Sequence, residues 1–333
     1  MRIARIHALG APLSLDDVPQ PAPGPGEVLV RVAACGVNFA DTLMVKGTYQ
    51  EKPALPFAPG MEIAGEIVAL GEGVGNGVGN GVGDGVGAPV LGQRVAGMAG
   101  QGGFAEYAVL PAAACLPIPP GMPMAEAAAF LIAYGTSHVA LDYRAGLKPA
   151  ERLLVLGAAG GVGLTAVEIG KLMGAEVIAC ARGSDKLAIA RQKGADHLID
   201  SAVDDIRGRV KALGGADVVY DPVGGTQFTA ALRACNPEAR LLPLGFASGE
   251  IPQIPANLLL VKNLTVIGLY WGAYMRFKPK VLTESFAQLF AWYGAGRLKP
   301  HVSHALPLDA AQNALDLLAT RKATGKVVVV PTA

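Results

Sequence analysis

Between residues 120 and 271, strand-like and helix-like segments alternate, and this alternation constrains the fold more than any other feature. Short aliphatic runs, each long enough for one buried strand, are separated by stretches with helical periodicity. Such alternation predicts a doubly wound α/β sheet of parallel strands. The expected strands are Arg152 to Leu156, Glu176 to Cys180, His197 to Ile199, Ala216 to Tyr220, Arg240 to Leu244 and a sixth within "NLTVIGLYW".

The segment that precedes this unit has a different character. It is β-rich, with strand-like runs such as "EVLVRVAAC" and "MEIAGEIVAL" between turns of proline and glycine. One short helix is expected at "NFADTLMVKG", with Asn38 as its N-cap. A longer helix is expected from Met124 to Asp142, at the entry to the alternating unit.

After residue 271 the pattern of strand-like and helix-like segments changes again, and the last strand-like run is "KVVVV". A length of 333 residues is too great for one ordinary core and suits two domains. We therefore expect one α/β domain at residues 121–271. Residues 1–120 and 272–333 are expected to form the first and second parts of another domain.

Two stretches are rich in glycine, and only one has the spacing of a phosphate-binding turn. From Gly71 to Gly87 every second residue is glycine and no helix follows, which indicates an expanded surface loop. The stretch "LGAAGGVG" lies between a buried strand and a helix, and Ala158-x-Gly160-x-x-Gly163 matches the dinucleotide fingerprint. We expect the turn and the positive end of the helix to bind a pyrophosphate through Ala159, Gly160, Gly161, Val162 and Gly163.

The end of the next strand indicates which dinucleotide binds. Enzymes that use NAD place an acidic residue there to bind the ribose 2′-hydroxyl. This chain has Arg182, which can bind a 2′-phosphate, with Ser184 and Lys186 nearby. The alternative is that Arg182 and Lys186 are solvated surface charges. The sequence thus favours NADPH as the cofactor.

Composition and charge argue against several classes of partner. A net charge of +1 gives no electrostatic reason to expect nucleic acid. No apolar run approaches the roughly 20 residues that span a bilayer, and charges interrupt the start "MRIARIHALG", so neither a membrane nor a secretory signal is expected. The four cysteines are far apart with no C-x-x-C spacing, which is typical of a reduced, cytoplasmic chain.

Several motifs together resemble the medium-chain dehydrogenase/reductase superfamily over essentially the full length of the chain. They are "ACGVNFADTLMVKGTY", "PGMEIAGEI", "AAGGVG", "YDPVGG" and "GKVVVV". Within the superfamily the chain is similar to the zinc-free quinone oxidoreductase group, the relatives of zeta-crystallin. The resemblance implies an α/β fold class, with a GroES-like β-rich catalytic domain and a Rossmann cofactor domain.

Compared with the zinc alcohol dehydrogenases of that superfamily, this chain lacks the metal ligands. Asn38 and Met61 replace a cysteine and a histidine, a third ligand would fall near Ile132, and residues 85–110 contain no cysteine for a structural zinc lobe. Amide, thioether and alkyl groups do not form a zinc site, so no metal is expected. Without zinc to polarise an alcohol, reduction of an already activated acceptor is favoured.

The resemblance also implies roles for individual residues. Asn38 would lie near the nicotinamide and Tyr49 falls where related enoyl thioester reductases have an acid tyrosine, so both are candidate catalytic residues. Each also has a plain interpretation, Asn38 as a helix cap and Tyr49 as a loop aromatic. Asp41 is expected to orient or cap rather than transfer protons, and Asp200 replaces a tyrosine that is frequent in relatives. The remaining implied cofactor contacts are Thr136, Pro222, Val223, Gly245, Phe246, Leu269, Tyr270, Trp271 and Lys322.

The function that these features favour is NADPH-dependent hydride transfer to a quinone or a similar conjugated carbonyl such as an enone. Two alternatives stay open: reduction of enoyl thioesters, and NADPH binding without turnover, as in crystallin-like relatives. The resemblance implies a homodimer through the sixth strand of the cofactor domain. The aromatic run "YWGAYMRF" after that strand would line the acceptor pocket or pack at this interface.

Overall fold

The computed structural model describes residues 1–75 and 88–331, so most of the Gly71–Gly87 repeat lies outside the described residues. The chain divides into two compact units. Unit 1 comprises Met1–Ile132, Leu282–Gly294 and Lys299–Ala333, and unit 2 comprises Ala133–Val281 and Ala295–Leu298. The units change over at residues 132 and 281, whereas the sequence placed the domain boundaries at 120 and 271.

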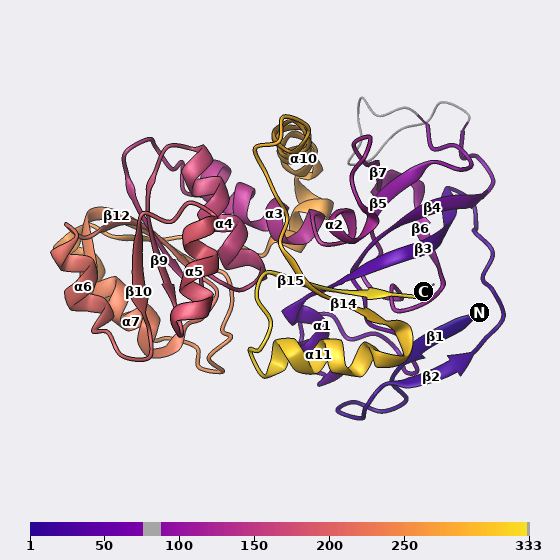
Figure 1. Cartoon of the computed structure of the whole chain (residues 1–333), viewed down its shortest axis with the longest axis horizontal. Coiled ribbons are helices and arrows are strands. Elements are labelled where there is room, and N and C mark those ends of the chain that lie inside the picture. The colour runs from indigo at the N-terminus through magenta and orange to yellow at the C-terminus, as the bar shows by residue number, and fades with distance from the viewer. Residues whose placement is uncertain (76–87, 332–333) are drawn as a thin grey trace. The chain divides into compact units, whose positions relative to one another are not determined.

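Unit 2 contains a sheet of six parallel strands in the order β10-β9-β8-β11-β12-β13. Numbered along the chain from β8, this is the order 3-2-1-4-5-6 of the Rossmann fold. Helices flank the sheet, with α4 and α5 on one side of the strands and α6 and α7 on the other (Figure 1). The strands are β8 Arg152–Leu156, β9 Glu176–Ala181, β10 His197–Asp200, β11 Ala216–Asp221, β12 Cys235–Pro243 and β13 Thr265–Val266, and the helices are α4 Gly161–Leu172, α5 Ser184–Gln192, α6 Ile206–Ala212 and α7 Gly225–Ala234.

The predicted parallel, doubly wound sheet is confirmed, and its burial explains its sequence pattern. The residues of β8 from Leu153 to Leu156 are all buried, because helices cover both faces of the sheet. A strand buried on both faces needs a continuous aliphatic run rather than an alternating one. In helix α7, by contrast, residues at helical spacing such as Phe228, Ala231 and Leu232 are the ones that pack in the core.

The sixth strand lies within the predicted stretch, as β13, and pairs over only two residues, because β12 ends at Pro243, which has no N–H to extend the ladder. One predicted helix differs from the structure. The helix expected from Met124 to Asp142 is three pieces: α2 (Met124–Ala128), α3 (Leu131–His138) and a π-helical segment (Val139–Arg144). Ala129 leaves helical dihedrals at φ −100° and ψ 7°, which ends α2.

Unit 1 is built on a mixed sheet of seven strands that contains segments from both ends of the chain. The strand order is β14-β15-β3-β4-β5-β7, and β6 also pairs with β3. The C-terminal strand pairs antiparallel with β3, so the first and last parts of the chain share one sheet. The strands are β3 Glu27–Val37, β4 Glu62–Leu70, β5 Arg94–Met98, β6 Tyr107–Pro111, β7 Cys115–Pro117, β14 Val302–Pro307 and β15 Lys326–Val330.

Four α-helices, α2 among them, and a short hairpin complete the described part of unit 1. Helix α1 packs beside α11, and residues of both join the core that includes Val30, Ile67 and Val329. Strands β1 and β2 pair antiparallel. The bounds are β1 Arg2–Arg5, β2 Ser14–Asp17, α1 Phe39–Val45, α10 Pro279–Gly294 and α11 Ala311–Ala319, with α8 Ala256–Lys262 and α9 Tyr274–Phe277 in unit 2. Among the described residues, no helix has the length and apolar character to cross a membrane.

Candidate active site

The chain turns sharply at the carboxyl end of β8, and three glycines shape the turn. Gly157 has φ +60°, a left-handed conformation that favours glycine. The Gly160 N–H donates to the Gly157 carbonyl at 2.9 Å and closes the turn. At Gly163, in the first turn of α4, an added Cβ would lie 2.2 Å from the Gly157 oxygen, so only glycine lets the helix approach the strand this closely.

The structure assigns the turning role to Gly157, whereas the sequence placed the first position of the motif at Ala158. Ala158 is fully buried, and its N–H donates to the Cys180 carbonyl of the neighbouring strand at 3.0 Å. The even spacing of Gly157, Gly160 and Gly163 was the signal that could have identified Gly157.

The start of α4 offers backbone donors for an anion. The N–H groups of Gly161, Val162 and Gly163 have no partner among the residues that the structure describes. First-turn N–H groups lack an intrahelical acceptor, and the helix dipole favours negative charge beside them. The Gly160 N–H is bonded inside the turn. The three unbonded N–H groups in the first turn of α4 suit the pyrophosphate of a dinucleotide.

The loops that follow β11 and β12 join each other beside this turn. The Ala247 N–H donates to the Pro222 carbonyl at 3.1 Å, and the Ser248 N–H donates to the Val223 carbonyl at 2.9 Å. A Cβ on Gly157 would lie 2.9 Å from Val223 Cγ2, so Val223 borders the turn. The structure thus brings together the predicted contacts Pro222, Val223, Gly245 and Phe246 at one edge of the sheet, at the switch in strand order.

Asp221 holds the loop after β11 through hydrogen bonds to its backbone. Its Oδ1 accepts the N–H groups of Val223 at 2.7 Å and Gly224 at 2.9 Å. Burial raises the pKa of this carboxyl to about 6, although hydrogen bonds from Gly224 and Val223 act to lower it. Because Asp221 is fully buried, its role is to hold the Pro222–Val223 turn.

At the end of β9, Arg182 is exposed and makes no ion pair with any residue that the structure describes. Ser184 begins α5 and Lys186 lies in its first turn. Asp200, at the end of the adjacent strand, accepts the Gly183 N–H at 3.0 Å and the Ala202 N–H at 2.9 Å. Hydrogen bonds from Ala202 and Gly183 hold the pKa of Asp200 below its usual value, and the charge of Arg182 adds to this effect. An ionised carboxylate therefore lies near the cationic side chain.

Thr136, the predicted contact to the nicotinamide end of the cofactor, lies in α3, which is bonded to the start of α4. The neighbouring Ser137 hydroxyl donates to the Val162 carbonyl at 2.9 Å. It also contacts the hydroxyl of Thr165 at 2.8 Å and that of Tyr220 at 2.8 Å. This buried hydroxyl network fixes α3 against the glycine turn.

Leu269, Tyr270 and Trp271 follow β13, where the aromatic run begins. Tyr274 is buried, accepts a hydrogen bond from the Arg144 guanidinium at 3.0 Å and lies 4.6 Å from the ring of Phe277 between centroids. Tyr274 therefore packs within unit 2. Tyr270 and Phe277 are exposed.

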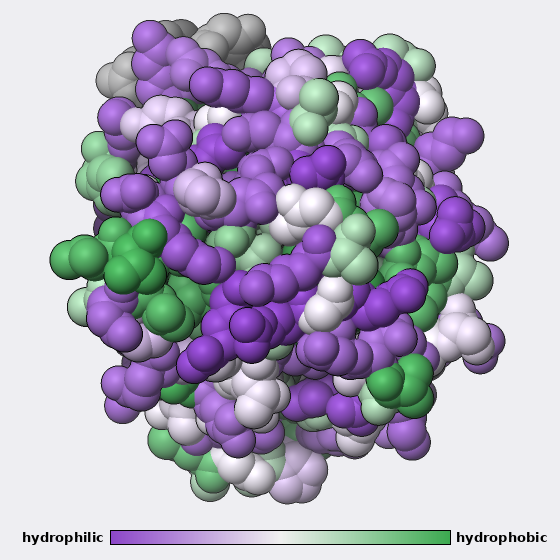
Figure 2. All heavy atoms as spheres, turned by 90° about the vertical axis from the view of Figure 1, so that its left-hand side faces the viewer, coloured by the Kyte–Doolittle hydropathy of each residue, from purple (hydrophilic) through white to green (hydrophobic). Residues whose placement is uncertain are grey.

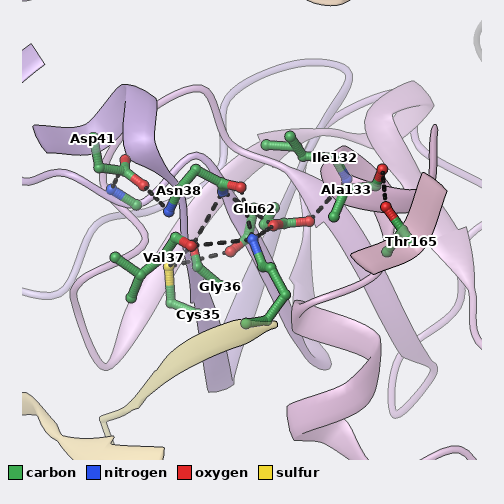
Figure 3. A network of polar contacts seen from close by, with 11 residues as sticks. Cys35, Gly36, Val37, Asn38, Asp41, Glu62, Ile132, Ala133 and Thr165 are labelled. Atoms are coloured by element: carbon green, nitrogen blue, oxygen red, sulfur yellow. Dashed lines mark hydrogen bonds and ion pairs between the residues drawn. The ribbon is translucent and has the colours of Figure 1, made fainter. Parts of the chain in front are cut away.

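In unit 1, Asn38 occupies the N-cap position of α1, as predicted, but the capping side chain is that of Asp41 (Figure 3). Asp41 Oδ2 accepts the Asn38 N–H at 2.8 Å, and Oδ1 accepts the Gly60 N–H at 2.9 Å. Burial raises the pKa of Asp41 to about 6, against the lowering effect of these two N–H groups. The structure therefore agrees with an orienting role for Asp41.

The Asn38 side chain turns instead toward a buried ion pair that the sequence analysis missed. Lys326 Nζ lies 2.7 Å from Glu62 Oε1 and donates to Asn38 Oδ1 at 2.6 Å. Asn38 Nδ2 donates to Glu62 Oε1 at 3.0 Å (Figure 3). The available signal was a charged residue at the start of each of two largely apolar strands, Glu62 in "EIAGEIVAL" and Lys326 in "KVVVV".

The two other predicted residues of unit 1 lie near the ends of helices. Tyr49 follows α1 and packs, partly buried, against the core of unit 1. Lys322 is exposed in the turn between α11 and β15.

Comparison with known proteins agrees with this architecture. Residues 24–120 match the family model of the alcohol dehydrogenase GroES-like domain, and residues 161–288 match that of zinc-binding dehydrogenase. The chain is 42% identical to quinone oxidoreductase-like protein 2 homolog of Nematostella vectensis, over 98% of this chain and 88% of that protein. It is also 33% identical to prostaglandin reductase-3 of Bos taurus, over 94% of this chain and 83% of that protein.

Two solved structures extend the match to the whole fold. The quinone oxidoreductase of Thermus thermophilus, also solved with NADPH, has a TM-score of 0.85 and 35% identity, over 99% of this chain and 100% of that chain. The NADPH complex of the Escherichia coli quinone oxidoreductase has a TM-score of 0.88 and 27% identity, over the same shares. The chain belongs to the quinone oxidoreductase group of the medium-chain dehydrogenase/reductase superfamily.

One matching family model names zinc, and the described residues of this chain offer no donor set for it. Asn38 contributes an amide that is bonded to Glu62 and Lys326, and Ile132 contributes only a backbone N–H, which donates to Glu62 Oε2 at 3.0 Å. Across the described residues, no group of three or more His, Cys, Asp or Glu side chains could hold a metal ion. The residues present do not fit a catalytic zinc, which needs three protein ligands in one place.

Proposed function

We propose that this protein is an NADPH-dependent, zinc-independent reductase that transfers hydride to a quinone or a similar conjugated carbonyl. The observation that carries the proposal is the turn at Gly157, whose close packing leaves three backbone N–H groups without a partner at the start of α4, within the described residues. The solved quinone oxidoreductases with NADPH support the choice of cofactor and acceptor.

The choice of NADPH over NADH rests on Arg182. A guanidinium binds phosphate oxygens in bidentate fashion, and Arg182 is exposed and not engaged in an ion pair within the described chain. Ser184 and Lys186 lie in the first turn of α5 and add donors beside it. Asp200 opposes this preference, because its carboxylate repels a 2′-phosphate.

When bound, NADPH supplies the hydride, and the protein supplies position and electrostatic complementarity. The turn of Gly157 to Gly163 binds the pyrophosphate through the free N–H groups. The loops at Pro222–Val223 and Gly245–Phe246 border the dinucleotide along the same edge of the sheet. Asn38 would lie near the nicotinamide. Water can protonate the oxygen of a reduced quinone, whereas Tyr49 is the candidate proton donor for an acceptor that leaves an enolate.

The proposal is tested by adding small quinones and enones to purified, chelator-treated protein and following the absorbance of NADPH. We expect its consumption with at least one acceptor, at an unchanged rate after chelation. If no quinone or enone causes consumption, or if zinc restores a lost activity, this function is wrong.

A second candidate is reduction of enoyl thioesters, because Tyr49 falls where related enoyl thioester reductases have an acid tyrosine. An enoyl acceptor leaves an enolate that needs a proton, so this reaction depends on an acid more than quinone reduction does. Tyr49→Phe should then abolish turnover of an enoyl thioester and spare that of a quinone. Saturable NADPH binding without turnover of any acceptor would favour the non-catalytic, crystallin-like alternative.

We also propose that the protein forms a homodimer through the edge of the unit 2 sheet. β13 pairs with β12 on one side, and no described strand pairs with its other side. The adjacent helix α8 exposes Leu260 and Val261 at 76% and 67% of their surface. Figure 2, which views the left-hand side of Figure 1, shows apolar patches that interrupt a mostly hydrophilic face. A second copy of the chain would cover the strand edge and the apolar side chains together.

A further inference from the structure

Unit 1 contains a buried ion pair to which the proposed mechanism assigns no role. Lys326 is 6% exposed and Glu62 is 1% exposed, and their charged atoms lie 2.7 Å apart. Removing two charges from water is costly, and an apolar pair of similar size packs at least as well in most cores. A buried pair in this position therefore needs an explanation other than packing.

The ammonium group of Lys326 is fully engaged. It donates to the Val37 carbonyl at 3.1 Å, to Asn38 Oδ1 at 2.6 Å and to Glu62 Oε1 at 2.7 Å. These three acceptors use all three of its hydrogens. The group therefore offers no free donor to a substrate, and its effect on the reaction must pass through the residues that it contacts.

Asn38 is held by both charges at once. Its amide oxygen faces the ammonium, and its amide nitrogen donates to the carboxylate at 3.0 Å and to the Gly36 carbonyl at 3.4 Å. A flipped amide would place NH2 against the ammonium and oxygen against the carboxylate, so only one orientation is compatible with the pair. Asp41 fixes the backbone of the same residue by accepting its N–H.

The backbone around the network leaves room for these contacts. At Gly36 an added Cβ would lie 2.0 Å from the Ala128 carbonyl oxygen and 2.8 Å from Glu62 Oε1. The second oxygen of Glu62 accepts the N–H of Ile132, the last residue of unit 1 before unit 2 begins. Glu62 thus connects the strand β4, the N-cap of α1, the strand β15 and the start of α3 within unit 1.

We propose that Lys326 and Glu62 are positioning residues that hold the Asn38 amide in one orientation beside the nicotinamide and the acceptor. The proposal rests on the proposed function, which gives Asn38 its place in the active site. The pair acts through Asn38, and neither charge touches the reacting atoms. Losing the pair therefore lowers the rate of hydride transfer while leaving NADPH binding, most of whose proposed contacts are in unit 2, little changed.

The kinetic test uses a neutral replacement of the whole pair, Lys326→Met with Glu62→Gln, because Lys326→Met alone leaves an unpaired buried carboxylate and is prone to misfold. For the double variant we expect kcat with a quinone to fall at least tenfold, with the NADPH KM within about threefold of the original value. Lys326→Arg keeps a charged donor and should recover most of kcat.

The matched control is Lys193→Met, which removes a lysine that pairs with Glu168 at 3.5 Å in unit 2. Its kcat should stay within about twofold of the original. If the double variant of Lys326 and Glu62 also keeps kcat within twofold, the pair has a structural role only and the proposal is wrong.

A second readout does not depend on turnover. In protein labelled with ¹⁵N only at asparagine, the side-chain signal of Asn38 is assigned by its absence in Asn38→Ser. We expect its hydrogen exchange to be at least 100-fold slower than that of an exposed asparagine amide, and to lose this protection in the double variant. Fast exchange in the unaltered protein, or protection that survives in the double variant, overturns the proposal. If the unaltered protein reduces no acceptor, the proposed function fails and the exchange result alone decides whether the pair holds Asn38.

Discussion

At the scale of single residues, neighbouring charges decide which hydrogen bonds a polar side chain makes. The sequence predicted Asn38 as an N-cap, and the residue does take that position, yet its amide faces Glu62 and Lys326. Hydrogen bonds to charged partners are roughly twice as strong as neutral ones, so the buried pair fixes the amide of this side chain. Asp41 then satisfies the backbone of the helix start.

Arg182 should determine the preference between the two nicotinamide cofactors. In Arg182→Asp the charge-assisted contact to the 2′-phosphate is lost and replaced by repulsion, so we expect kcat/KM for NADPH to fall about 100-fold (~2.7 kcal/mol). The kcat/KM for NADH should change less than about threefold. Arg191→Asp, at the other end of α5, is the control. Equal losses with both cofactors would show that Arg182 does not bind the 2′-phosphate.

Asp200 should limit that same preference. Asp200→Asn keeps an oxygen that can accept the Gly183 N–H and removes the negative charge. We expect the ratio of kcat/KM for NADPH over NADH to rise by up to about tenfold, because one repulsive charge beside the 2′-phosphate is gone. The measurement is the pair of cofactor titrations at fixed acceptor concentration. A ratio that stays constant would place the carboxylate outside the range of the phosphate.

Asp221 should make the stability of the unliganded protein depend on pH. Burial raises its pKa from 3.8 to about 6, so the folded state binds the proton more tightly than the unfolded chain does. The resulting stabilisation is complete below about pH 4 and is lost as the pH rises through about 6. Asp221→Asn keeps the oxygen that accepts the N–H groups of Val223 and Gly224 but does not titrate.

Chemical unfolding at pH 4, 5, 6 and 7 compares the two proteins. The free energy of unfolding of the unaltered protein should fall relative to that of the Asn variant by up to about 3 kcal/mol across this range. Asp41, whose pKa is also raised to about 6, contributes to both proteins and cancels in the difference. Parallel curves would mean that Asp221 titrates as an ordinary carboxyl.

At the scale of elements, sequence periodicity predicted most helices and strands correctly. It failed where a tertiary contact interrupts a helix. The run from Met124 to Asp142 reads as one helix, but the chain breaks at Ala129, next to the buried Phe130. The Phe130 ring stacks on Phe290 of α10, with centroids 5.4 Å apart. This contact joins segments 160 residues apart in sequence, so no local pattern reports it.

The approach of α4 to β8 should tolerate no side chain at Gly163. In Gly163→Ala the new Cβ would lie 2.2 Å from the Gly157 oxygen, so the helix must move and the N–H donors with it. We expect a loss of about 1–3 kcal/mol in stability and a fall of at least tenfold in NADPH affinity, measured by chemical unfolding and by cofactor fluorescence.

Gly160→Ala is the matched variant for stability. Its Cβ would lie 3.4 Å from the same oxygen, an ordinary contact, and its backbone φ is −79°. Its stability should therefore stay close to that of the unaltered protein. A similar loss of stability in both variants would contradict the role of close packing at Gly163.

At the scale of the whole molecule, the unpaired edge of β13 should determine the oligomeric state. We expect the protein to have twice the 34.0 kDa mass of one chain in sedimentation or light scattering. Leu260→Glu should shift it toward the monomer, because the charge would be buried in the interface. Val203→Glu is the control: Val203 is 80% exposed and follows β10, the opposite edge of the same sheet. A monomeric unaltered protein would disprove the dimer.

The sequence by itself determined the parallel doubly wound sheet, the glycine turn before α4 and Arg182 at the end of β9. Each of these depends on residues that are close in the chain, whose aliphatic runs, helical periodicity and glycine spacing reflect local conformational limits. Only the tertiary structure showed that Gly157 makes the turn, that β13 pairs over two residues, and that Lys326 and Glu62 meet at Asn38. The meeting at Asn38 arises from contacts between residues up to 288 positions apart, and these contacts form only when the strands of the two chain ends pair in one sheet. The role of Gly157 depends on the backbone conformation of the folded turn, and the length of β13 depends on its pairing with β12.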